Sequence, residues 1–400
     1  MIPLPSFENA LSLISKKIIH TPVVYSPSMS RLLNAQIFLK LENLQVTGSF
    51  KVRGAMYKLL SNKTAISKKG VVTASAGNHA QGVALSAKQA GIPSTIVMPE
   101  WASITKQEAT RNYGGEVIIA GKSIGESLEK AHEIEKSGRT FIHPFDDPDI
   151  VIGQGTIGLE ILNDLDDVEM VVLPVGGGGL IGGVSACIKQ MRPQVKIVGV
   201  QAEACPSAAA ALKRKRVTEV PATTSIADGI SVRKTGEFTF GLIRSFVEKI
   251  ALVDEELIAS AMLMLLERKK ILAEGAGAVP LAALLGGKIK IKKGQKVLLV
   301  ISGGNVDSPL LDRIINRGLN RSGRVIRVTV VLSDVPGAMA ALLTAIARMK
   351  ANVLHIHHER NALDIPMNTS RVTLELETRG RDHSTEIIGE LKNEGYPVTV

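Results

Sequence analysis

Lys51 is a candidate for covalent chemistry, because the amine of a lysine can bind an aldehyde cofactor as a Schiff base. It lies in the run Thr47-Gly48-Ser49-Phe50-Lys51-Val52-Arg53-Gly54-Ala55. Three glycine-rich segments follow along the chain: Ser75-Ala76-Gly77-Asn78-His79, Gly176-Gly177-Gly178-Gly179 and Ser302-Gly303-Gly304-Asn305. Glycines let backbone N–H groups close around a phosphate group. Each segment is a weak signal alone, but the four in this order predict one site built around a single cofactor.

The tetraglycine has a specific place in the pattern, between an apolar run at 170–175 and a helical pattern at 180–191. Parallel sheets bind ligands beyond the carboxyl ends of their strands, and helix N-termini favour anions. The segment alone fits a phosphate site and a tight turn with close backbone packing equally well. It is neither a GxGxxG fingerprint in its proper context nor a P-loop, since no Lys-Ser/Thr pair closes it.

Strands and helices must alternate to position these segments, and the sequence shows that alternation. The expected strands are 36–41, 70–74, 94–98, 116–119, 170–175, 196–201 and 297–301, and the expected helices include 79–90, 103–113 and 180–191. This order predicts a doubly wound α/β protein. A length of 400 residues predicts two or three domains, and 45% hydrophobic with only 3% aromatic residues suits helices packed on buried parallel sheets.

The pattern changes near residue 320. Strands are expected at 324–332, 353–360, 370–378 and 396–400, with helices at 338–349 and 384–393. The order βαββαβ predicts a ferredoxin-like unit with its own core, and therefore a separate domain.

The formal net charge of +10 raises the question of nucleic-acid binding. The charges are scattered, and the one dense run, 213–216, has no aromatic residues among them for base stacking. We therefore expect no nucleic-acid partner and place this run at a solvated helix end or loop. The uncharged stretch 170–188 approaches membrane-spanning length, but Pro174 and six glycines favour a strand, a turn and a helix start, so no membrane partner is expected.

Cys187 and Cys205 cannot form a disulfide framework and show no metal-ligand spacing. The N-terminal residues lack the basic and apolar regions of a signal peptide. A reducing, cytoplasmic compartment is the expected location.

Together these residues resemble the pyridoxal-phosphate enzymes of the tryptophan-synthase-β fold type, and most closely the threonine dehydratases, or threonine ammonia-lyases. The resemblance spans about 18–309. It rests on the lysine run, on Ser75 to Gly82, on the two later glycine segments and on Gly153-Gln154-Gly155-Thr156-Ile157-Gly158-Leu159-Glu160. The C-terminal unit resembles an ACT domain, a small regulatory module that often binds amino acids.

The resemblance implies a fold and a division into domains. The fold is that of two doubly wound parallel-sheet domains (pyridoxal-phosphate fold type II) followed by a ferredoxin-like ACT domain. The large cofactor-binding domain would comprise 1–46 and 151–320, the small α/β domain 47–150, and the regulatory domain 325–400. A homo-oligomer, a dimer or tetramer, is also implied.

The resemblance also implies the role of each site residue. Lys51 would hold pyridoxal 5'-phosphate and then act as the base at the substrate Cα, while Phe50 would pack against the cofactor ring. Asn78 would hydrogen-bond the phenolic oxygen, and Ser302 would face the pyridine nitrogen. The phosphate would be bound by Gly176, Gly177, Gly178 and Gly179. The substrate carboxylate would be bound by Ser75, Ala76, Gly77, Asn78 and His79.

Two positions separate this chain from the related serine racemases. Racemases carry a serine as the second acid/base where this chain has Ala76, which favours a dehydratase. Racemases also use acidic residues to bind a divalent metal; Glu203 matches one of them, but Ala209 stands where another would be. We therefore predict no divalent metal site, while a monovalent cation stays open. Cysteine synthases differ at the lysine motif, with Lys-Asp-Arg in place of Lys51-Val52-Arg53.

Several residues fit two interpretations. Arg53 and His79 are expected to be mainly structural, and Asn78 functional although Asn is also a common helix cap. Glu274 matches a family glutamate near the cofactor ring, and a buried hydrogen-bonded role fits equally well. His355, His357 and His358 are expected on a polar surface rather than at a metal. Residues 334–337 fit an effector contact and a simple helix start equally well.

The function that the resemblance implies is deamination of L-threonine to 2-oxobutanoate and ammonia, with L-serine as a slower substrate. An L-serine dehydratase or serine racemase is the alternative within this fold, and an inactive amino-acid sensor is the alternative outside enzymes. An amino acid at the ACT unit would regulate the enzyme. Isoleucine or valine would fit a biosynthetic role, other effectors a degradative one, and the sequence does not decide between these roles.

Overall fold

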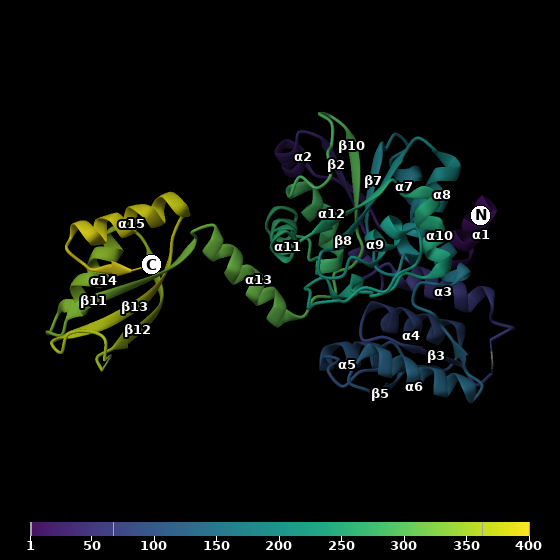
Figure 1. Ribbon diagram of the computed structural model, residues 1–400, viewed down its shortest axis with the longest axis horizontal. Coiled ribbons are helices and arrows are strands. Elements are labelled where there is room, and N and C mark those ends of the chain that lie inside the picture. Colours follow the sequence, from purple (N-terminus) through teal and green to yellow (C-terminus); the bar gives the residue numbers. More distant parts are fainter. Residues whose placement is uncertain (1, 67, 362, 400) are drawn as a thin grey trace. The chain divides into compact units, whose positions relative to one another are not determined.

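The computed structural model describes residues 2–66, 68–361 and 363–399. It divides into two compact units, Met1–Asp307 and Ser308–Val400 (Figure 1). The strands of the first unit are β1 Val23–Tyr25, β2 Gln36–Leu41, β3 Val71–Ala74, β4 Ser94–Met98, β5 Glu116–Ile119, β6 Thr140–Phe141, β7 Met170–Pro174, β8 Lys196–Ala202, β9 Lys249–Val253 and β10 Lys296–Ile301. Its helices are α1 Leu4–Ile14, α2 Pro27–Leu33, α3 Lys51–Ser61, α4 Asn78–Ala90, α5 Ile104–Asn112, α6 Ile124–Lys136, α7 Pro148–Asp164, α8 Gly179–Met191, α9 Ser207–Arg214, α10 Glu237–Phe246, α11 Glu255–Lys269 and α12 Gly275–Leu285, with short 3-10 turns η1 Glu42–Leu44 and η2 Asp228–Ile230.

The larger sheet has the strand order β1-β2-β10-β7-β8-β9 and is parallel except for β1. Its central strand β7 is buried throughout, as is typical of a parallel strand with helices on both faces. Helices α7, α8 and α10 pack on one face through Ile157, Val184 and Ile243. The opposite face is covered by α12, which packs against β7 to β10.

The smaller sheet has the order β5-β4-β3-β6, and all of its neighbouring strands are parallel. Side chains of α3 and α4 pack on one face, and side chains of α6 on the other. We call residues 71–141, from β3 to β6, the small lobe (blue in Figure 1). Two mainly parallel sheets, each with helices on both faces, agree with the α/β class predicted from the sequence.

The C-terminal unit contains α13 Ser308–Arg321, β11 Val325–Ser333, α14 Ala338–Arg348, β12 Asn352–Glu359, β13 Thr369–Glu377, α15 Arg381–Asn393 and β14 Val398–Thr399. Its antiparallel sheet has the order β12-β13-β11-β14, and its core lies between the sheet and α14 and α15. After α13 the elements follow the order βαββαβ, which is compatible with the ferredoxin-like arrangement. His355, His357 and His358 lie exposed on β12.

A buried group of four charges ties the large sheet to the helices around the site. The Arg53 guanidinium donates to both oxygens of Glu42 and of Glu160, at 2.6 to 2.8 Å. The amine of Lys40 donates to Glu160 at 2.7 Å and to the carbonyl of Thr21 at 2.6 Å. All four charged side chains are at most 1% exposed. This quartet joins β2, η1, α3 and α7.

Helices α3 and α7 can approach closely only because glycines stand at their contact. A Cβ on Gly153 would lie 2.6 Å from the Cα of Gly54 and 2.7 Å from the carbonyl oxygen of Arg53. These are backbone atoms that cannot turn aside. The glycines of the segment 153–158 therefore serve helix packing, which fixes the start of α3 behind the site.

Two other expectations can be compared with the structure. The apolar stretch 170–188 forms β7, the glycine loop and most of α8, as predicted, and none of the described helices is long and apolar enough to span a membrane. The basic run 213–216 is exposed at the end of α9, also as predicted.

Candidate active site

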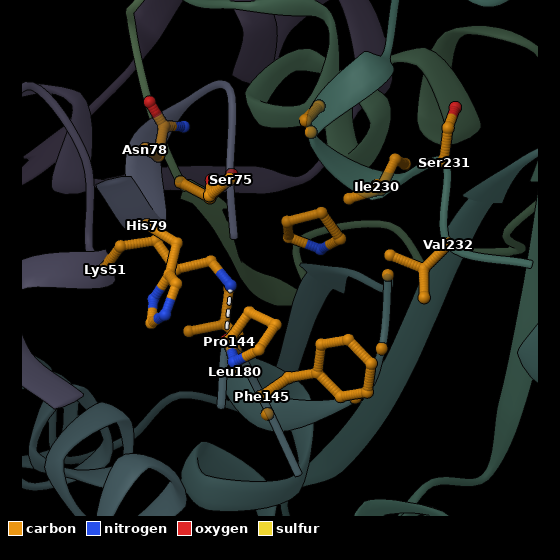
Figure 2. A pocket seen from close by; sticks show the side chains of 18 of the residues that line it. Lys51, Ser75, Asn78, His79, Pro144, Phe145, Leu180, Ile230, Ser231 and Val232 are labelled. Atoms are coloured by element: carbon orange, nitrogen blue, oxygen red, sulfur yellow. Dashed lines mark hydrogen bonds between the residues drawn. The ribbon is translucent and has the colours of Figure 1, made fainter. Parts of the chain in front are cut away.

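Lys51 is the first residue of α3, and its side chain points into a cavity of about 460 Å³ between the two sheets of the first unit (Figure 2). Its Nζ atom donates a hydrogen bond to the carbonyl oxygen of Pro144 at 2.8 Å. The same amine lies 5.4 Å from the centroid of the Phe50 ring. Figure 2 shows Lys51, Ser75, Asn78 and His79 on one side of the cavity, facing Phe145, Ile230 and Val232.

The loop before Lys51 is held by the last glycine segment of the site. Phe50 N donates to the carbonyl of Ser302 at 3.1 Å, and Gly304 N donates to the carbonyl of Gly48 at 2.9 Å. Between these bonds, Ser49 and Gly303 form an isolated antiparallel bridge. The lysine run and the segment Ser302–Asn305 therefore form one structural element, although about 250 residues separate them in the sequence.

Side-chain amides continue this connection across the cavity wall. Asn305 Nδ2 donates to the carbonyl of Thr47 and to Oδ1 of Asn78, both at 2.8 Å. Asn78 Nδ2 in turn donates to the two carboxylate oxygens of Glu274 at 2.9 and 3.0 Å. Asn78 is therefore held in a fixed orientation by two partners, and it is the first residue of α4 rather than its cap, which is Gly77.

The loop 75–79 joins β3 to α4. Ser75 Oγ accepts a hydrogen bond from Gly77 N at 3.2 Å, which shapes the turn. His79 is buried, and its Nε2 lies 3.2 Å from the carbonyl oxygen of Ile142, so this nitrogen carries the proton. Burial, together with the nearby Lys51 charge, lowers the pKa of His79 to about 3. His79 is therefore a neutral imidazole that supports the wall.

The tetraglycine lies between β7 and α8 at the carboxyl end of the large sheet. Gly178 has φ +101 and ψ −7, in the left-handed region, and a Cβ there would lie 2.8 Å from the Cβ of Thr239. No side chain caps the start of α8. The first N–H groups of a helix have no acceptor within the helix, so they are available to an anion at this end of the cavity.

Two titratable groups in this cavity have strongly shifted pKa values. Burial lowers the pKa of Lys51 to about 8, and the Glu274 charge opposes this shift. Burial raises the pKa of Glu274 to about 7; Asp228 adds to this, while the hydrogen bonds from Asn78 and the charges of Lys106 and Lys51 oppose it. A lysine and a carboxyl that both titrate near neutral pH in one cavity are typical of a catalytic site.

We expect Glu274→Gln to flatten the dependence of apoprotein stability on pH. Between about pH 4.5 and 7 the folded protein keeps a proton on Glu274 that the unfolded chain releases, so the free energy of unfolding falls as pH rises through this window. Glutamine has no such proton, so the variant should be the more stable protein at pH 8, by up to about 3 kcal/mol. Urea unfolding at pH 4.5, 6 and 8 measures this. The exposed Glu129→Gln is the control, and parallel curves for wild type and Glu274→Gln would contradict the assignment.

The structure brings together most of the residues that the sequence predicted for the site. The cavity wall includes Phe50, Lys51, Ser75, Asn78, His79, Gly176, Gly177, Gly178, Gly179 and Ser302. Ala76 and Gly77 lie in the same loop as Ser75, but the described wall is formed by the residues on either side of them. Arg53 lies outside the wall, in the buried quartet.

Five further residues of the cavity wall were not predicted from the sequence: His143, Phe145, Asp228, Ile230 and Val232. His143 Nδ1 accepts hydrogen bonds from the backbone of Phe145 and Asp146. The dense run of polar and aromatic residues 143–147 directly after an expected strand was a possible signal for this loop. The segment 228–232 gave no comparable signal.

The donor groups of the cavity fit a phosphorylated aldehyde cofactor. A lysine amine with a lowered pKa, a helix start with uncapped N–H groups and the buried Ser302 hydroxyl surround one space. The family model of pyridoxal-phosphate dependent enzymes matches residues 14–303.

The chain belongs to this family. Its cofactor is pyridoxal phosphate. The curated L-threonine ammonia-lyase of Thermotoga maritima is 49% identical over the full length of both chains, and that of Geobacter sulfurreducens is 46% identical over the same share. The catabolic L-threonine dehydratase TdcB of Staphylococcus aureus is 45% identical over 80% of this chain and 94% of its own.

Two solved structures have a fold similar to that of this chain. Maize serine racemase matches with a TM-score of 0.74 and 33% identity, over 80% of this chain and 98% of its own. The processed form of threonine deaminase isoform 2 from Solanum lycopersicum matches with a TM-score of 0.74 and 34% identity, over 78% of this chain and 87% of its own.

The similarity to a serine racemase raises the question of whether this chain has a divalent metal site. Among the residues that the structure describes, no group of three or more His, Cys, Asp and Glu side chains could hold a metal ion. Glu203 forms an ion pair with Lys288 at 3.6 Å.

Proposed function

We propose that this enzyme deaminates L-threonine to 2-oxobutanoate and ammonia. The observation that supports this most strongly is Lys51, whose amine has a pKa of about 8 and lies in a cavity that also contains the glycine loop and Ser302. The full-length relatives that are L-threonine ammonia-lyases point to the same reaction.

Pyridoxal phosphate, when bound, draws electrons away from the substrate Cα so that the Cα proton and the β-hydroxyl can leave. Lys51 holds the cofactor and then accepts the Cα proton, because an amine with a pKa near 8 is partly neutral at physiological pH. The backbone of residues 75–79 binds the substrate carboxylate, and Asn78 and Ser302 orient the cofactor ring. Ser302 is buried in the cavity wall and would meet the ring nitrogen with a neutral hydroxyl, which would favour elimination over transamination.

Residue 76 separates the proposed reaction from racemisation. Ala76 has no proton to deliver to the opposite face of the substrate, and it is 9% exposed in the turn beside Ser75. L-Serine differs from L-threonine by one methyl group, which a pocket distinguishes by only about 1–3 kcal/mol. We therefore propose L-serine as a slower substrate of the same site.

The glycine loop provides a prediction about the cofactor. Gly178→Ala should weaken binding of pyridoxal phosphate roughly 5- to 30-fold. An L-residue at φ +101 is strained by roughly 1–2 kcal/mol, and the free loop would relax into a conformation that it must leave again to bind the phosphate. Equilibrium dialysis measures the dissociation constant. Gly241→Ala in α10 is the matched control, because nothing lies within 4 Å of its added Cβ. Equal affinities of the two variants for pyridoxal phosphate would contradict the proposal that this loop binds the phosphate.

The function is tested by product formation from L-threonine with the cofactor-loaded protein. The expected result is equimolar 2-oxobutanoate and ammonia, with a lower kcat/KM for L-serine. Formation of D-serine from L-serine, without a 2-oxo acid, would instead identify a racemase. If the protein shows cofactor absorbance but turns over no β-hydroxy amino acid, the assignment to the family stands and the proposed substrate is wrong.

We propose further that the C-terminal unit is an ACT domain that binds an amino-acid effector, and that residues 47–150 act as the small domain of the catalytic part. The turn 334–337 is the proposed effector contact, because Val335 is 59% exposed there and Gly337 is the N-cap of α14. Titration of the full chain with L-isoleucine and L-valine should change kcat/KM for L-threonine. Asp334→Ala should alter that response and Arg348→Ala should not; an unaltered response in Asp334→Ala would contradict the contact.

A further inference from the structure

Lys106 connects helix α5 of the small lobe to two segments outside that lobe. Lys106 Nζ lies 3.4 Å from Oδ2 of Asp228 and 3.4 Å from Oδ2 of Asp307. Ser103, the cap of α5, adds a hydrogen bond to the other oxygen of Asp307 at 3.4 Å. The Lys106 side chain is only 17% exposed. Burial alone would lower the pKa of Lys106, but the two carboxylates raise it above its ordinary value, so the amine is charged.

The two carboxylates belong to different segments of the chain. Asp228 begins η2 and itself lines the cavity, and it is followed by Gly229, Ile230, Ser231 and Val232, which form the wall opposite Lys51. Asp307 is the last residue of the first unit, and α13 begins at the next residue. The Lys106 ammonium group therefore joins three segments: the small lobe, the wall formed by 228–232 and the residue directly before α13.

We propose that Lys106 is a positioning residue: its pair with Asp228 holds the 228–232 wall against the small lobe and so keeps the cavity closed, and its pair with Asp307 links that closure to the start of α13. The kinetic part of this proposal rests on the proposed function, and the structural part does not.

The strength of these pairs suits a contact that opens and closes. Asp228 is 67% exposed and Asp307 39%, and ion pairs with so much solvent access are weak. A substrate could therefore enter without a large barrier. Because both carboxylates share one amine, movement of Asp307 changes how firmly Lys106 holds Asp228.

The same pair influences the chemistry of the cavity. Four groups act on Glu274 from the elements around it: Asn78 by hydrogen bonds, and Asp228, Lys106 and Lys51 by charge. Loss of Lys106 would therefore loosen the wall and leave the Asp228 carboxylate unbalanced near Glu274. Both effects act on the proposed reaction without any contact between Lys106 and the substrate.

The test is hydrogen–deuterium exchange of the cofactor-loaded full chain, with kinetics on L-threonine in parallel. Lys106→Gln should increase exchange severalfold both in α5 and in residues 228–232, and raise KM more than it lowers kcat. Lys106→Arg, which keeps the charge, should restore protection. Arg111→Gln is the matched control, because it removes a charge from the same helix, where Arg111 bonds to Gln107.

The chain also supplies an optical reporter. Trp101 is the only tryptophan in the sequence and lies shortly before α5, 60% exposed. Its quenching by acrylamide should increase in Lys106→Gln and not in Arg111→Gln.

Substitution of each carboxylate tests one part of the proposal: Asp228 the closure of the cavity, and Asp307 the link to α13. Asp228→Asn should loosen residues 228–232 as Lys106→Gln does, whereas Asp307→Asn should loosen α5 and the first turn of α13. Unchanged exchange at 228–232 in Lys106→Gln would overturn the closure, and wild-type exchange throughout Asp307→Asn would overturn the link to α13. If wild type fails to deaminate L-threonine while the exchange pattern holds, the substrate assignment falls and the positioning role of Lys106 stands.

Discussion

Lys51→Met is expected to abolish turnover of L-threonine. The substitution removes the group that holds the cofactor and the base at the substrate Cα, and a positioned base alone contributes roughly 10²–10⁴ in rate. Loss of cofactor attachment adds to this, so the decrease in kcat should exceed about 10⁴-fold. The measurement is 2-oxobutanoate formation together with the visible absorbance of the bound cofactor.

The same substitution should stabilise the apoprotein at neutral pH. Burial lowers the pKa of Lys51 to about 8 from an ordinary value near 10.5. Below pH 8 the folded protein therefore carries a charge that its surroundings disfavour, and this penalty disappears as pH rises from about 8 to 10.5, where only the unfolded chain keeps the proton. Methionine removes the penalty at every pH, which bounds the gain at roughly 3 kcal/mol at pH 7. The lost hydrogen bond to Pro144 reduces it.

Lys58→Met is the control for both measurements, because Lys58 is another partly buried lysine of α3 and pairs with Asp147 and Asp149 away from the cavity. It should stay active and lose a little stability. An active Lys51→Met protein would refute the assigned role of the lysine. An apoprotein less stable than wild type at pH 7 would refute the account of its lowered pKa.

Arg53→Met is expected to destabilise the fold by about 3–5 kcal/mol, because it leaves two buried carboxylates with too little positive charge. Burial alone would raise the pKa of Glu42, but the charge and hydrogen bonds of Arg53 hold it below its usual range. In wild type this pair therefore adds stability above the ordinary pKa of a glutamate, and the contribution is lost as pH falls through the folded value. Thermal and urea unfolding at pH 7 and pH 4 measure both effects.

A surface pair gives the comparison for Arg53. Lys130 lies 2.7 Å from Glu133 on α6 and is 47% exposed, so Lys130→Met should change stability far less than Arg53→Met. If Arg53→Met were equally mild, the quartet would not stabilise the fold in the way that its burial implies. A second substitution, Glu160→Gln, should be strongly destabilising as well, because it removes partners from both Lys40 and Arg53.

Local sequence signals were sufficient to predict those parts of the site that a single short segment forms. The runs at 71–74 and 170–174 indicate buried strands because both of their faces are mainly apolar, and the glycines after them mark the turns to α4 and α8. Lys51 and Ser302 were found through motifs. The element order of the C-terminal unit followed from alternating strands with clear helix patterns between them.

Contacts between distant segments could not be predicted in this way. Nothing in the local sequence links Asn305 to Asn78, or Lys106 to Asp228, because each is a polar residue with many possible partners. Helix α12 is apolar on all sides and includes Pro280, so it has no amphipathic period to reveal it. Helix α7 begins with an Asp cap and a proline in its first turn, so its start could have been predicted from the sequence.

The pairing of Gly48–Phe50 with Ser302–Gly304 has a consequence for synthesis of the protein. Domains form from the N-terminus as the chain leaves the ribosome, and contacts between distant residues form late. The small lobe can assemble from its own strands, but the loop before Lys51 lacks its backbone partners until residue 304 has emerged. We therefore expect a chain that ends before residue 304 to hold Lys51 in no fixed position, and cofactor binding to begin only after the catalytic part is complete.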